Sequence, residues 1–527
     1  MNEKQITDMG AWAKKNAAVE LPQVILPGGE VTITESAGKL FRLIAPAHRM
    51  FVRGGAVQIL VMLDDELLAL GILRPAAARS LFEKFARFRA WRPGENYRLV
   101  LKPVNCPQPM ADALLQSEEA LTLLPRVQGL INCPVVREVN GKLGVAGRGY
   151  DKVTRLIVTG GKTPPKVELK VAVRALLALL AEFSFQTEGD QARAIASLIS
   201  PALKTGMFLH GRVPAVVTEA DQSQAGKTYL QKLNAAIYNE RVSLVTCRHG
   251  GVGSSIDESL NQALVAGRPF IQFDNFRGRF DSTHLEAFLT AEKAFSCRVR
   301  YRGEITVPPK HYLIFLTSNG VDTTRDFANR SNIIRIRKQP PGFVFTKFPE
   351  GDLLAHVRRR QAYYLGCVVA VIREWHKQGK PVTDETRHDF RDWVQLVDWI
   401  CQHLFGTGPV MDRHQQAQEQ VSNPALVWLR NVVLAIQEDG ALNRALTATD
   451  LNRLCDGHGL EIPGRRPYAH EEAAIRVIGT IMARLFRDRP TVEADGFVVI
   501  KEEIYVSRAN SSVGGSFKGK TYTVTKP

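Results

Sequence analysis

The chain has 527 residues, of which 45% are hydrophobic and 23% charged, the composition of an ordinary globular protein with room for about three domains. Its formal net charge of +16 predicts attraction to polyanions such as nucleic acids, with a merely basic enzyme as the alternative. The seven cysteines are dispersed and include no Cys-x-x-Cys pair, so we expect reduced thiols and no zinc site. The sequence shows no signal-peptide pattern and no apolar run of about 18 residues. We therefore expect a cytoplasmic protein without a membrane partner.

Residues 1–120 have the composition of a mixed α/β domain. Runs rich in β-branched and aromatic residues predict strands near residues 31–34, 40–44, 51–53 and 57–62. Residues 76–86 have the spacing of an amphipathic helix. This pattern fits three alternatives: a collar domain that binds DNA, a collar domain that holds the subunits of an assembly together, or a plain scaffold. Residues 121–200 follow as an irregular, glycine-rich connector and as helices that lead into the next domain.

A strand–loop–helix segment lies within the domain predicted over residues 201–345. Residues 214–218 are an apolar run that predicts a buried strand, and after a turn ending in Gly-Lys-Thr the chain takes on helical spacing. In this context backbone N–H groups at the helix N-terminus bind phosphates, Lys227 reaches the β- and γ-phosphates of ATP, and Thr228 holds Mg²⁺. The predicted nucleotide-binding residues are Gln224, Ala225, Gly226, Lys227, Thr228 and Tyr229.

Two further apolar runs end in polar residues. Residues 269–275 predict a buried strand that ends in Asp274 and Asn275, as expected of the acid that holds Mg²⁺ with Thr228. Residues 311–319 predict another strand, which ends in Asn319, a residue that can orient water. Because parallel strands of an α/β sheet present their carboxyl ends at one edge, we predict that these side chains form one catalytic site with Lys227.

The order of these segments resembles that of AAA+ helicases of the superfamily-three and MCM-like groups, which phages, plasmids and genomic islands carry. The resemblance covers about residues 124–337 and is carried by Phe273-Asp-Asn-Phe-Arg-Gly, Leu285-Glu-Ala-Phe-Leu-Thr, Cys297-Arg-Val-Arg-Tyr-Arg-Gly, Leu316-Thr-Ser-Asn and Arg325-Asp-Phe-Ala-Asn-Arg330. It implies a replicative DNA helicase with an AAA+ P-loop core that uses ATP and Mg²⁺ and assembles as a ring, expected to be a hexamer, with a primase as a candidate partner. Asp221 in the phosphate loop and Asn275 after Asp274 depart from the family pattern.

The resemblance also implies roles for arginines near this core. Arg330 fits an arginine finger offered to the nucleotide of a neighbouring subunit, with a surface salt bridge as the alternative. Residues 298–307 alternate and turn at Arg-Gly, which predicts a β-hairpin with Arg298, Arg300 and Arg302 on one face. In the resembling helicases a hairpin at this place lines the pore and grips single-stranded DNA, whereas a solvated strand face is the alternative.

The rest of the chain predicts a helical lid and a C-terminal module. Residues 346–420 are predicted to form the lid and, from about residue 406, a linker. Residues 421–527 show three helical patterns followed by two strand patterns, which is the order of a winged-helix domain that binds duplex DNA. The same fold used for protein contacts is the alternative. We thus expect an α/β protein with an N-terminal α+β domain, an AAA+ core and a C-terminal winged helix.

Three functions are compatible with these patterns. The first is an ATP-dependent DNA helicase or translocase of a mobile genetic element. The second, favoured by Asp221 and Asn275, is a DNA-binding replication initiator or regulator that ATP switches without processive unwinding. A metabolic kinase with the same phosphate loop is the third. Since Asn275 cannot accept a proton, the catalytic base stays open between Glu219, Glu258 and no base at all.

Overall fold

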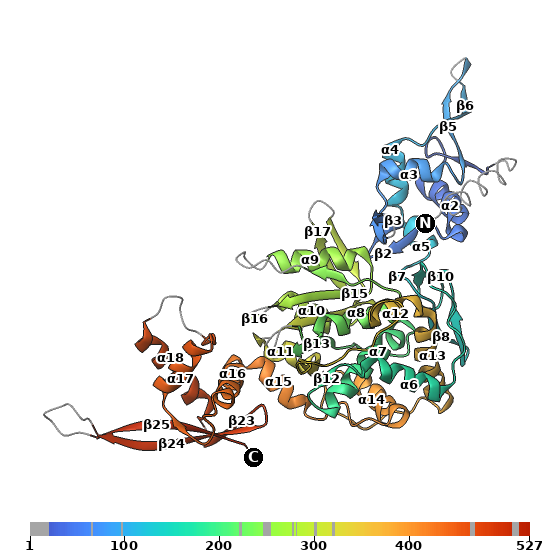
Figure 1. Ribbon diagram of the computed structural model, residues 1–527. Coiled ribbons are helices and arrows are strands. Elements are labelled where there is room, and N and C mark those ends of the chain that lie inside the picture. Colours follow the sequence, from blue (N-terminus) through green and yellow to red (C-terminus); the bar gives the residue numbers. More distant parts are fainter. Residues whose placement is uncertain are drawn as a thin grey trace. The chain divides into compact units, whose positions relative to one another are not determined.

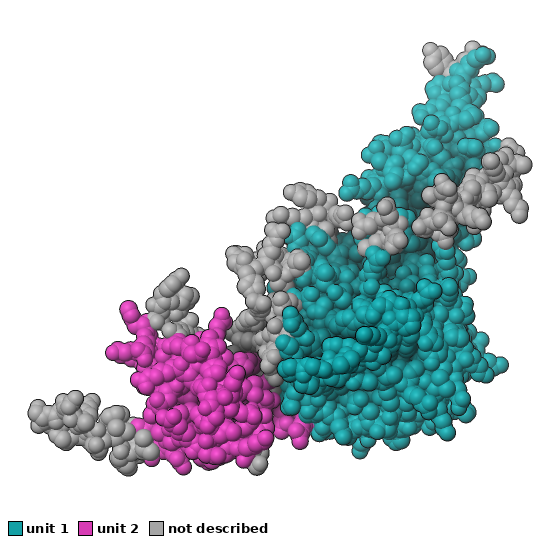
Figure 2. Space-filling view, viewed as in Figure 1, with its two compact units in different colours: residues 1–276, 282–319, 330–412 teal, residues 277–281, 320–329, 413–527 magenta. Residues whose placement is uncertain are grey.

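The structure is a computed structural model with mixed α/β architecture. It describes residues 21–64, 67–95, 98–220, 224–245, 254–276, 279–280, 282–299, 303–318, 322–463, 470–487, 489–507 and 516–526. The chain divides into two compact units, which Figure 2 shows in teal (residues 1–276, 282–319 and 330–412) and magenta (residues 277–281, 320–329 and 413–527). None of the helices in these described ranges has the length and apolar character needed to cross a membrane.

The first unit begins with a small α/β subdomain. Its sheets have the orders β1-β5-β6 and β2-β3-β4. Its core packs Phe41 against Phe82, with ring centroids 5.8 Å apart. The elements are β1 (Gln23–Ile25), α2 (Ile33–Ile44), η1 (Ala45–Ala47), β2 (Phe51–Arg53), β3 (Ala56–Asp64), β4 (Leu67–Ile72), α3 (Pro75–Phe82), β5 (Arg87–Pro93), β6 (Leu99–Pro103), α4 (Gln108–Leu115) and α5 (Glu118–Leu123).

Two predicted strands in this subdomain are wrong, because residues 33–44 form the helix α2. Thr32 caps it: its Oγ1 accepts a hydrogen bond from the Glu35 backbone N–H, while the Glu35 carboxylate accepts one from the Thr32 N–H. This capping box starts a helix within a β-branched run that resembles a strand. The predicted strands near 51–53 and 57–62 are confirmed as β2 and β3, and the predicted helix is confirmed as α3.

The connector is more regular than predicted. It contains five short strands in two sheets, of order β10-β11-β7 and β8-β9, before two helices begin. Glu240 and Arg268 form a buried ion pair of 2.7 Å beside it, and Glu240 also accepts a hydrogen bond from the Asn132 backbone N–H. The elements are β7 (Gly129–Ile131), β8 (Val135–Val139), β9 (Lys142–Ala146), β10 (Gly149–Asp151), β11 (Leu156–Val158), α6 (Leu169–Leu180), β12 (Ser184–Phe185) and α7 (Glu188–Thr205).

A six-stranded sheet of order β12-β21-β13-β19-β15-β14 forms the centre of the first unit. All its strands are parallel except β12, and every residue of β13 and β19 is buried, as expected of parallel strands covered on both faces. The strands are β13 (Ala215–Ala220), β14 (Ser243–Val245), β15 (Phe270–Phe276), β19 (Leu313–Ser318) and β21 (Ser331–Arg337). The intervening elements are α8 (Lys227–Ile237), α9 (Ser254–Ala266), α10 (Thr283–Thr290), β17 (Phe295–Val299), β18 (Gly303–Val307) and η3 (Pro309–His311).

Helices that follow the sheet belong to the same hydrophobic core. Trp375, Trp393 and Trp399 are buried there. Arg193 of α7 is fully buried, pairs with Asp190 at 2.6 Å and donates to the Val410 and Asp412 carbonyls at 2.8 Å. The helices are α12 (Leu353–Arg359), α13 (Gln361–Lys377), α14 (Arg391–Ile400) and the π-helix η4 (Cys401–Phe405).

The second unit has its own core and a sheet of order β22-β25-β24-β23. Three helices, α16 to α18, precede its last three strands, and β24 and β25 form a long ribbon (Figure 1). The segment expected as a linker contains the helix α15. The elements are β16 (Arg279–Phe280), β20 (Asp322–Thr323), α11 (Arg325–Asn329), α15 (His414–Ser422), α16 (Pro424–Glu438), β22 (Ala445–Leu446), α17 (Ala448–Gly457), α18 (Glu471–Leu485), β23 (Thr491–Ala494), β24 (Phe497–Ser507) and β25 (Ser516–Thr525).

Candidate functional site

The three described residues before α8, at positions 224–226, form a turn with two left-handed residues. Gln224 and Gly226 have φ angles of +64° and +94°, and α8 begins directly afterwards at Lys227. A Cβ atom at Gly226 would lie 3.3 Å from Cε1 of Phe183, so glycine suits both the left-handed backbone and the space. The first N–H groups of a helix have no intrahelical acceptor, and no described side chain caps those of α8. This turn can therefore receive an anion.

Lys227 is buried at the start of α8, with 7% of its surface exposed. Burial lowers its pKa, while the negative charges of Asp274 and Glu219 act against that shift. Glu219 is itself buried near the end of β13. The two carboxylates favour the protonated ammonium, which is the form that binds a phosphate.

Asp274 joins three elements at the carboxyl edge of the sheet. Its Oδ1 accepts hydrogen bonds from Oγ1 of Thr228 at 2.7 Å, from Oγ1 of Thr317 at 2.7 Å and from Nε2 of Gln272 at 3.2 Å. These residues come from α8, β19 and β15, which meet because β15 and β19 are parallel neighbours. The structure thus brings together Lys227, Thr228 and Asp274.

The donor set around Asp274 fits Mg²⁺ bound together with a nucleotide. Mg²⁺ is held in such sites by one or two carboxylates, hydroxyl groups, water and phosphate oxygens. Thr228 Oγ1 and Asp274 Oδ1, 2.7 Å apart, supply one hydroxyl and one carboxylate. Among the residues that the structure describes, no group of three or more His, Cys, Asp or Glu side chains could hold a metal ion. The phosphates would have to complete this site.

The remaining predicted site residues are placed only in part. Asn275 follows Asp274 in β15, but its side chain lies outside the described atoms, and Asn319 and Asp221 lie outside the described residues. Gln224, Ala225 and Gly226 form the turn, and Tyr229 lies in the first turn of α8. The Tyr229 hydroxyl accepts a hydrogen bond from the Leu354 N–H at 2.7 Å, which ties α8 to α12. Of the two candidate bases, Glu219 lies beside Lys227, and Glu258 is half-buried on α9.

Arg330 lies at the opposite edge of the sheet from Lys227. Its carbonyl accepts a hydrogen bond of 3.1 Å from the N–H of Ala215, the first residue of β13, whereas the phosphate-loop turn follows the last residue of that strand. At about 3.3 Å per residue, the strand separates the two places by about 16 Å. Arg330 is thus too far away to contact a phosphate held at Lys227 of the same chain.

Arg330 shares a cavity of about 330 Å³ with two arginines that sequence reasoning missed, Arg212 and Arg391. The Arg212 guanidinium donates to the Thr290 carbonyl at 3.0 Å and lies over the Phe390 ring, 5.0 Å from its centroid. No spacing pattern links these three arginines in the sequence, because the fold alone brings them to one cavity.

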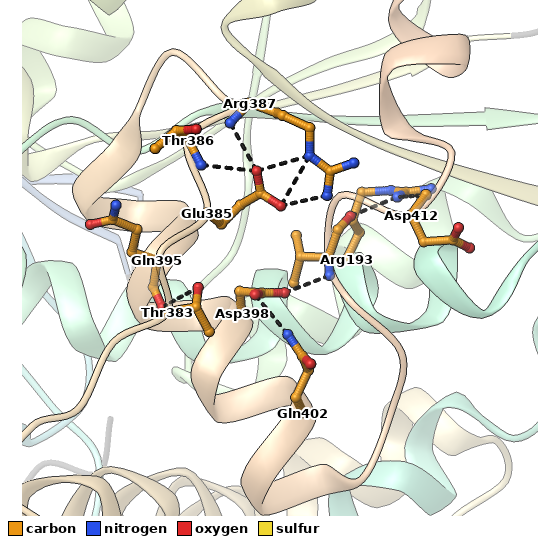
Figure 3. Close-up of polar contacts among 10 residues, drawn as sticks. Arg193, Thr383, Glu385, Thr386, Arg387, Gln395, Asp398, Gln402 and Asp412 are labelled. Carbon is orange, nitrogen blue, oxygen red and sulfur yellow. Dashed lines mark hydrogen bonds and ion pairs between the residues drawn. The ribbon is translucent and has the colours of Figure 1, made fainter.

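The segment that lines one side of this cavity is held by Glu385 (Figure 3). Its carboxylate accepts hydrogen bonds from the backbone N–H groups of Thr386 and Arg387 at 2.9 and 2.8 Å and from the Arg387 guanidinium. His388 follows and is buried. This local network orders the loop that precedes α14.

The predicted β-hairpin is confirmed by the antiparallel pairing of β17 and β18. Cys297 and Ile305 are buried on one of its faces, while Arg298 is exposed and lies directly across from Glu304. Arg298 and Glu304 are thus a cross-strand pair of opposite charge, and the Glu304 carboxylate accepts a hydrogen bond from the Ser296 hydroxyl. Arg300 and Arg302 lie outside the described residues.

Comparisons with known proteins add distant likenesses only. No family model matches the chain, and no curated protein matches its sequence. Among solved structures, the chain is similar to the apo C-terminal region of NrS-1, with 12% identity and a TM-score of 0.32 over 86% of this chain and all of that one. It is also similar to SCCmec type IV Cch, an active helicase, with 12% identity and a TM-score of 0.33 over 80% of this chain and 86% of that one. Likenesses this distant carry no chemistry over to this chain, whose function is argued from its own geometry.

Proposed function

We propose that the chain is an ATP-dependent DNA helicase or translocase that acts as a ring in the replication of a mobile genetic element. The observation that carries the proposal is the hydrogen bond between Thr228 and Asp274, beside buried Lys227, at the carboxyl edge of a parallel sheet. A positive-φ glycine before a helix, a lysine, a hydroxyl and an acid are the parts that hold Mg²⁺ and the phosphates of ATP in P-loop enzymes.

Each residue has a separate role in the proposed hydrolysis. The N–H groups of the first turn of α8 and the Lys227 ammonium bind the β- and γ-phosphates. Thr228 and Asp274 would hold Mg²⁺, which neutralises the charge that develops on the phosphates. Thr317 keeps the Asp274 carboxylate oriented, and Asn275 and Asn319 orient the attacking water. Glu219 is the candidate to accept its proton.

The position of Arg330 supports a ring. An arginine finger stabilises the transferred phosphoryl group, yet Arg330 lies at the wrong edge of the sheet to do so within its own chain. A neighbouring copy that presents Arg330 to Lys227 would complete the site, with a hexamer as the expected assembly. A ring whose sites span two subunits can couple hydrolysis to movement.

Nucleic-acid contacts are assigned to two further parts of the chain. The hairpin β17–β18, with Arg298, Arg300 and Arg302, is proposed to grip single-stranded DNA in the pore. The second unit, with three helices before a long β-ribbon, is proposed to be a winged helix that binds duplex DNA. A primase is the proposed protein partner, on the basis of the family resemblance alone.

One alternative keeps specific support. Asn275 stands where a proton-accepting acid is common in the resembling family, and the acid Glu304 lies directly across from Arg298 in the hairpin proposed to grip DNA. An ATP-switched initiator or regulator without processive unwinding would show both features. In that case ATP turnover would hardly respond to DNA.

ATP hydrolysis with and without single-stranded DNA tests the proposal. Lys227→Ala should abolish turnover, because it removes the charge on the β- and γ-phosphates, while Lys232→Ala on the exposed face of the same helix serves as the control. Stimulation by DNA in the parent protein supports the motor. ATP turnover that does not respond to DNA supports the regulator. ATP turnover at the parent rate in Lys227→Ala would show that Lys227 does not belong to an ATP site.

A further inference from the structure

A two-stranded ribbon extends from the N-terminal subdomain. Strand β5 pairs with β1 only from Arg87 to Arg89, and beyond that point β6 is its partner. Figure 1 shows this ribbon reaching away from α3 and α4. Phe88 and Ala90 near its base are buried in the subdomain core. The base is therefore anchored, while the outer part is free to meet another molecule.

Large apolar side chains are exposed on the outer part of the ribbon. Trp91 is 37% exposed, Leu99 57% and Val100 40%. The register places Trp91 across from Leu101, and Pro93 across from Leu99, so these four residues share one face with Arg89. Val100 lies across from Arg92 on the other face. Exposed apolar residues that lie together on one face are typical of an interaction site.

Positive charge accompanies these apolar residues. Residues 84–106 contain six Lys and Arg and a single acid, Glu95. Arg92 and Lys102 lie on the face opposite Trp91, whereas Arg89 lies on the same face, so both faces carry cations. Within the described part of the chain, the side chains of Arg89, Arg92 and Arg98 make no ion pair, and the Lys102 ammonium donates to the Pro93 carbonyl.

We propose that the β5–β6 ribbon binds duplex DNA by entering a groove. A two-stranded ribbon fits the major groove, which is about 12 Å wide, and a groove has phosphates along both walls. Cations on both faces match that arrangement, and Trp91 and Leu99 offer apolar contacts to base edges. The choice of DNA as the polyanion rests on the proposed function, but the ribbon would bind DNA without ATP. It is separate from the β17–β18 hairpin and from the second unit.

Photo-crosslinking of the full chain tests the contact directly. The photoreactive residue p-benzoylphenylalanine would replace Leu99, with a control protein carrying it in place of Val382, which is 54% exposed. Irradiation with a short duplex should crosslink DNA at position 99 and not at position 382, with or without ATP. Crosslinks to another protein chain, to single-stranded DNA in preference to duplex, or to nothing would each overturn the proposal.

Salt dependence of duplex binding supplies a second measurement. The triple variant Arg92→Gln, Arg98→Gln and Lys102→Gln removes three exposed cations from the ribbon, and Lys162→Gln, Lys166→Gln and Lys170→Gln removes the same charge elsewhere. Each lost phosphate contact lowers the slope of log affinity against log salt by about 0.9, so the ribbon variant should lose a slope of about 2 to 3. The control should keep the parent slope.

Equal slopes in the ribbon and control variants would contradict the proposal. Neither variant should change ATP hydrolysis measured without DNA, because the ribbon lies outside the candidate ATP site. If the chain hydrolysed no ATP at all, the proposed function would fail, yet the crosslink at position 99 would still report on the ribbon. The two failures are therefore distinguishable.

Discussion

At the scale of single residues, Asp274 Oδ1 is the atom on which the candidate site converges. It accepts hydrogen bonds from Thr228, Gln272 and Thr317. Thr317 escaped sequence reasoning, although it is a polar residue in an apolar run and stands two positions before Asn319, the sequence spacing typical of one strand face. Its alternation with Asn319 was the available signal. Only the parallel pairing of β15 and β19 shows that it contacts Asp274.

Thr317→Val should lower ATP turnover by about 10- to 100-fold, the usual effect of losing a hydrogen bond that orients a metal ligand. Valine keeps the shape of threonine but cannot donate to Asp274, so the carboxylate would hold Mg²⁺ less well. The Mg²⁺ concentration that gives half-maximal turnover should rise. Thr317→Ser, which keeps the hydroxyl, is the control and should restore most of the activity. An unchanged Mg²⁺ dependence in Thr317→Val would exclude this role.

His388 makes stability depend on pH. Its Nδ1 accepts a hydrogen bond from the Phe390 N–H at 3.0 Å, so the ring is neutral, and burial lowers its pKa to about 4. An unfolded chain has a histidine pKa of about 6.5, so the unfolded state binds the proton first as pH falls. The free energy of unfolding should therefore decrease between pH 6.5 and 4, by about 3 kcal/mol from this residue.

Urea unfolding of the parent protein and of His388→Gln at pH 7 and pH 5 measures this effect. The variant should lose less stability over that interval, since glutamine does not titrate. Glu240, whose pKa burial raises to about 7, contributes an opposite slope that is common to both proteins. The difference between the two proteins thus isolates His388, and identical pH dependence in both would contradict the account.

At the scale of elements, sequence patterns predicted long buried strands well and short or capped elements poorly. The strands that carry Asp274 and Thr317 are apolar runs flanked by polar residues, and they occur where predicted. The runs at residues 31–34 and 40–44 were misread as strands, because the capping box at Thr32 outweighs β-branched composition and starts the helix α2. The connector strands β7, β10 and β11 span three residues each, too few for any period to be detected.

The sequence patterns did not predict which elements far apart in the chain contact each other. Arg53, at the end of β2, is buried and donates to the carbonyls of Leu264 and Val265 in the last turn of α9, both at 2.8 Å. A cation suits that place because carbonyl groups at a helix C-terminus carry partial negative charge. The turn that follows Arg53 lies against β18, so the N-terminal subdomain is joined to the hairpin proposed to grip DNA.

Two neighbouring glycines test this junction. Gly54 and Gly55 both have positive φ, but a Cβ at Gly54 would lie 2.2 Å from the Thr306 carbonyl oxygen, whereas one at Gly55 would meet nothing within 4 Å. Both alanine variants bear the backbone cost, about 1–2 kcal/mol, and Gly54→Ala adds a clash with β18. Urea unfolding should show a larger loss of stability in Gly54→Ala, and stimulation of its ATP turnover by DNA should fall. Equal losses of stability and of DNA-stimulated ATP turnover in the two variants would contradict a role for this junction.

At the scale of the whole molecule, the proposed catalytic site is shared between two copies of the chain. Lys227, Thr228 and Asp274 lie at one edge of the sheet and Arg330 at the other. The sequence pattern proposed Arg330 as a finger but could not tell at which edge it lies. The parallel pairing of β13 and β21 supplies that information. Arg330→Ala should slow hydrolysis by about 10³- to 10⁵-fold while leaving ATP affinity intact.

Mixing two inactive variants tests whether the catalytic site is shared between copies. Lys227→Ala and Arg330→Ala should each be inactive alone. In mixed assemblies, an Arg330→Ala copy supplies an intact Lys227 and its neighbour an intact Arg330, so ATP turnover should reappear. Arg325→Ala, an exposed arginine nearby in the sequence, is the control and should retain parent activity. Mixtures that stay inactive, together with loss of ATP binding in Arg330→Ala, would contradict a site shared between subunits.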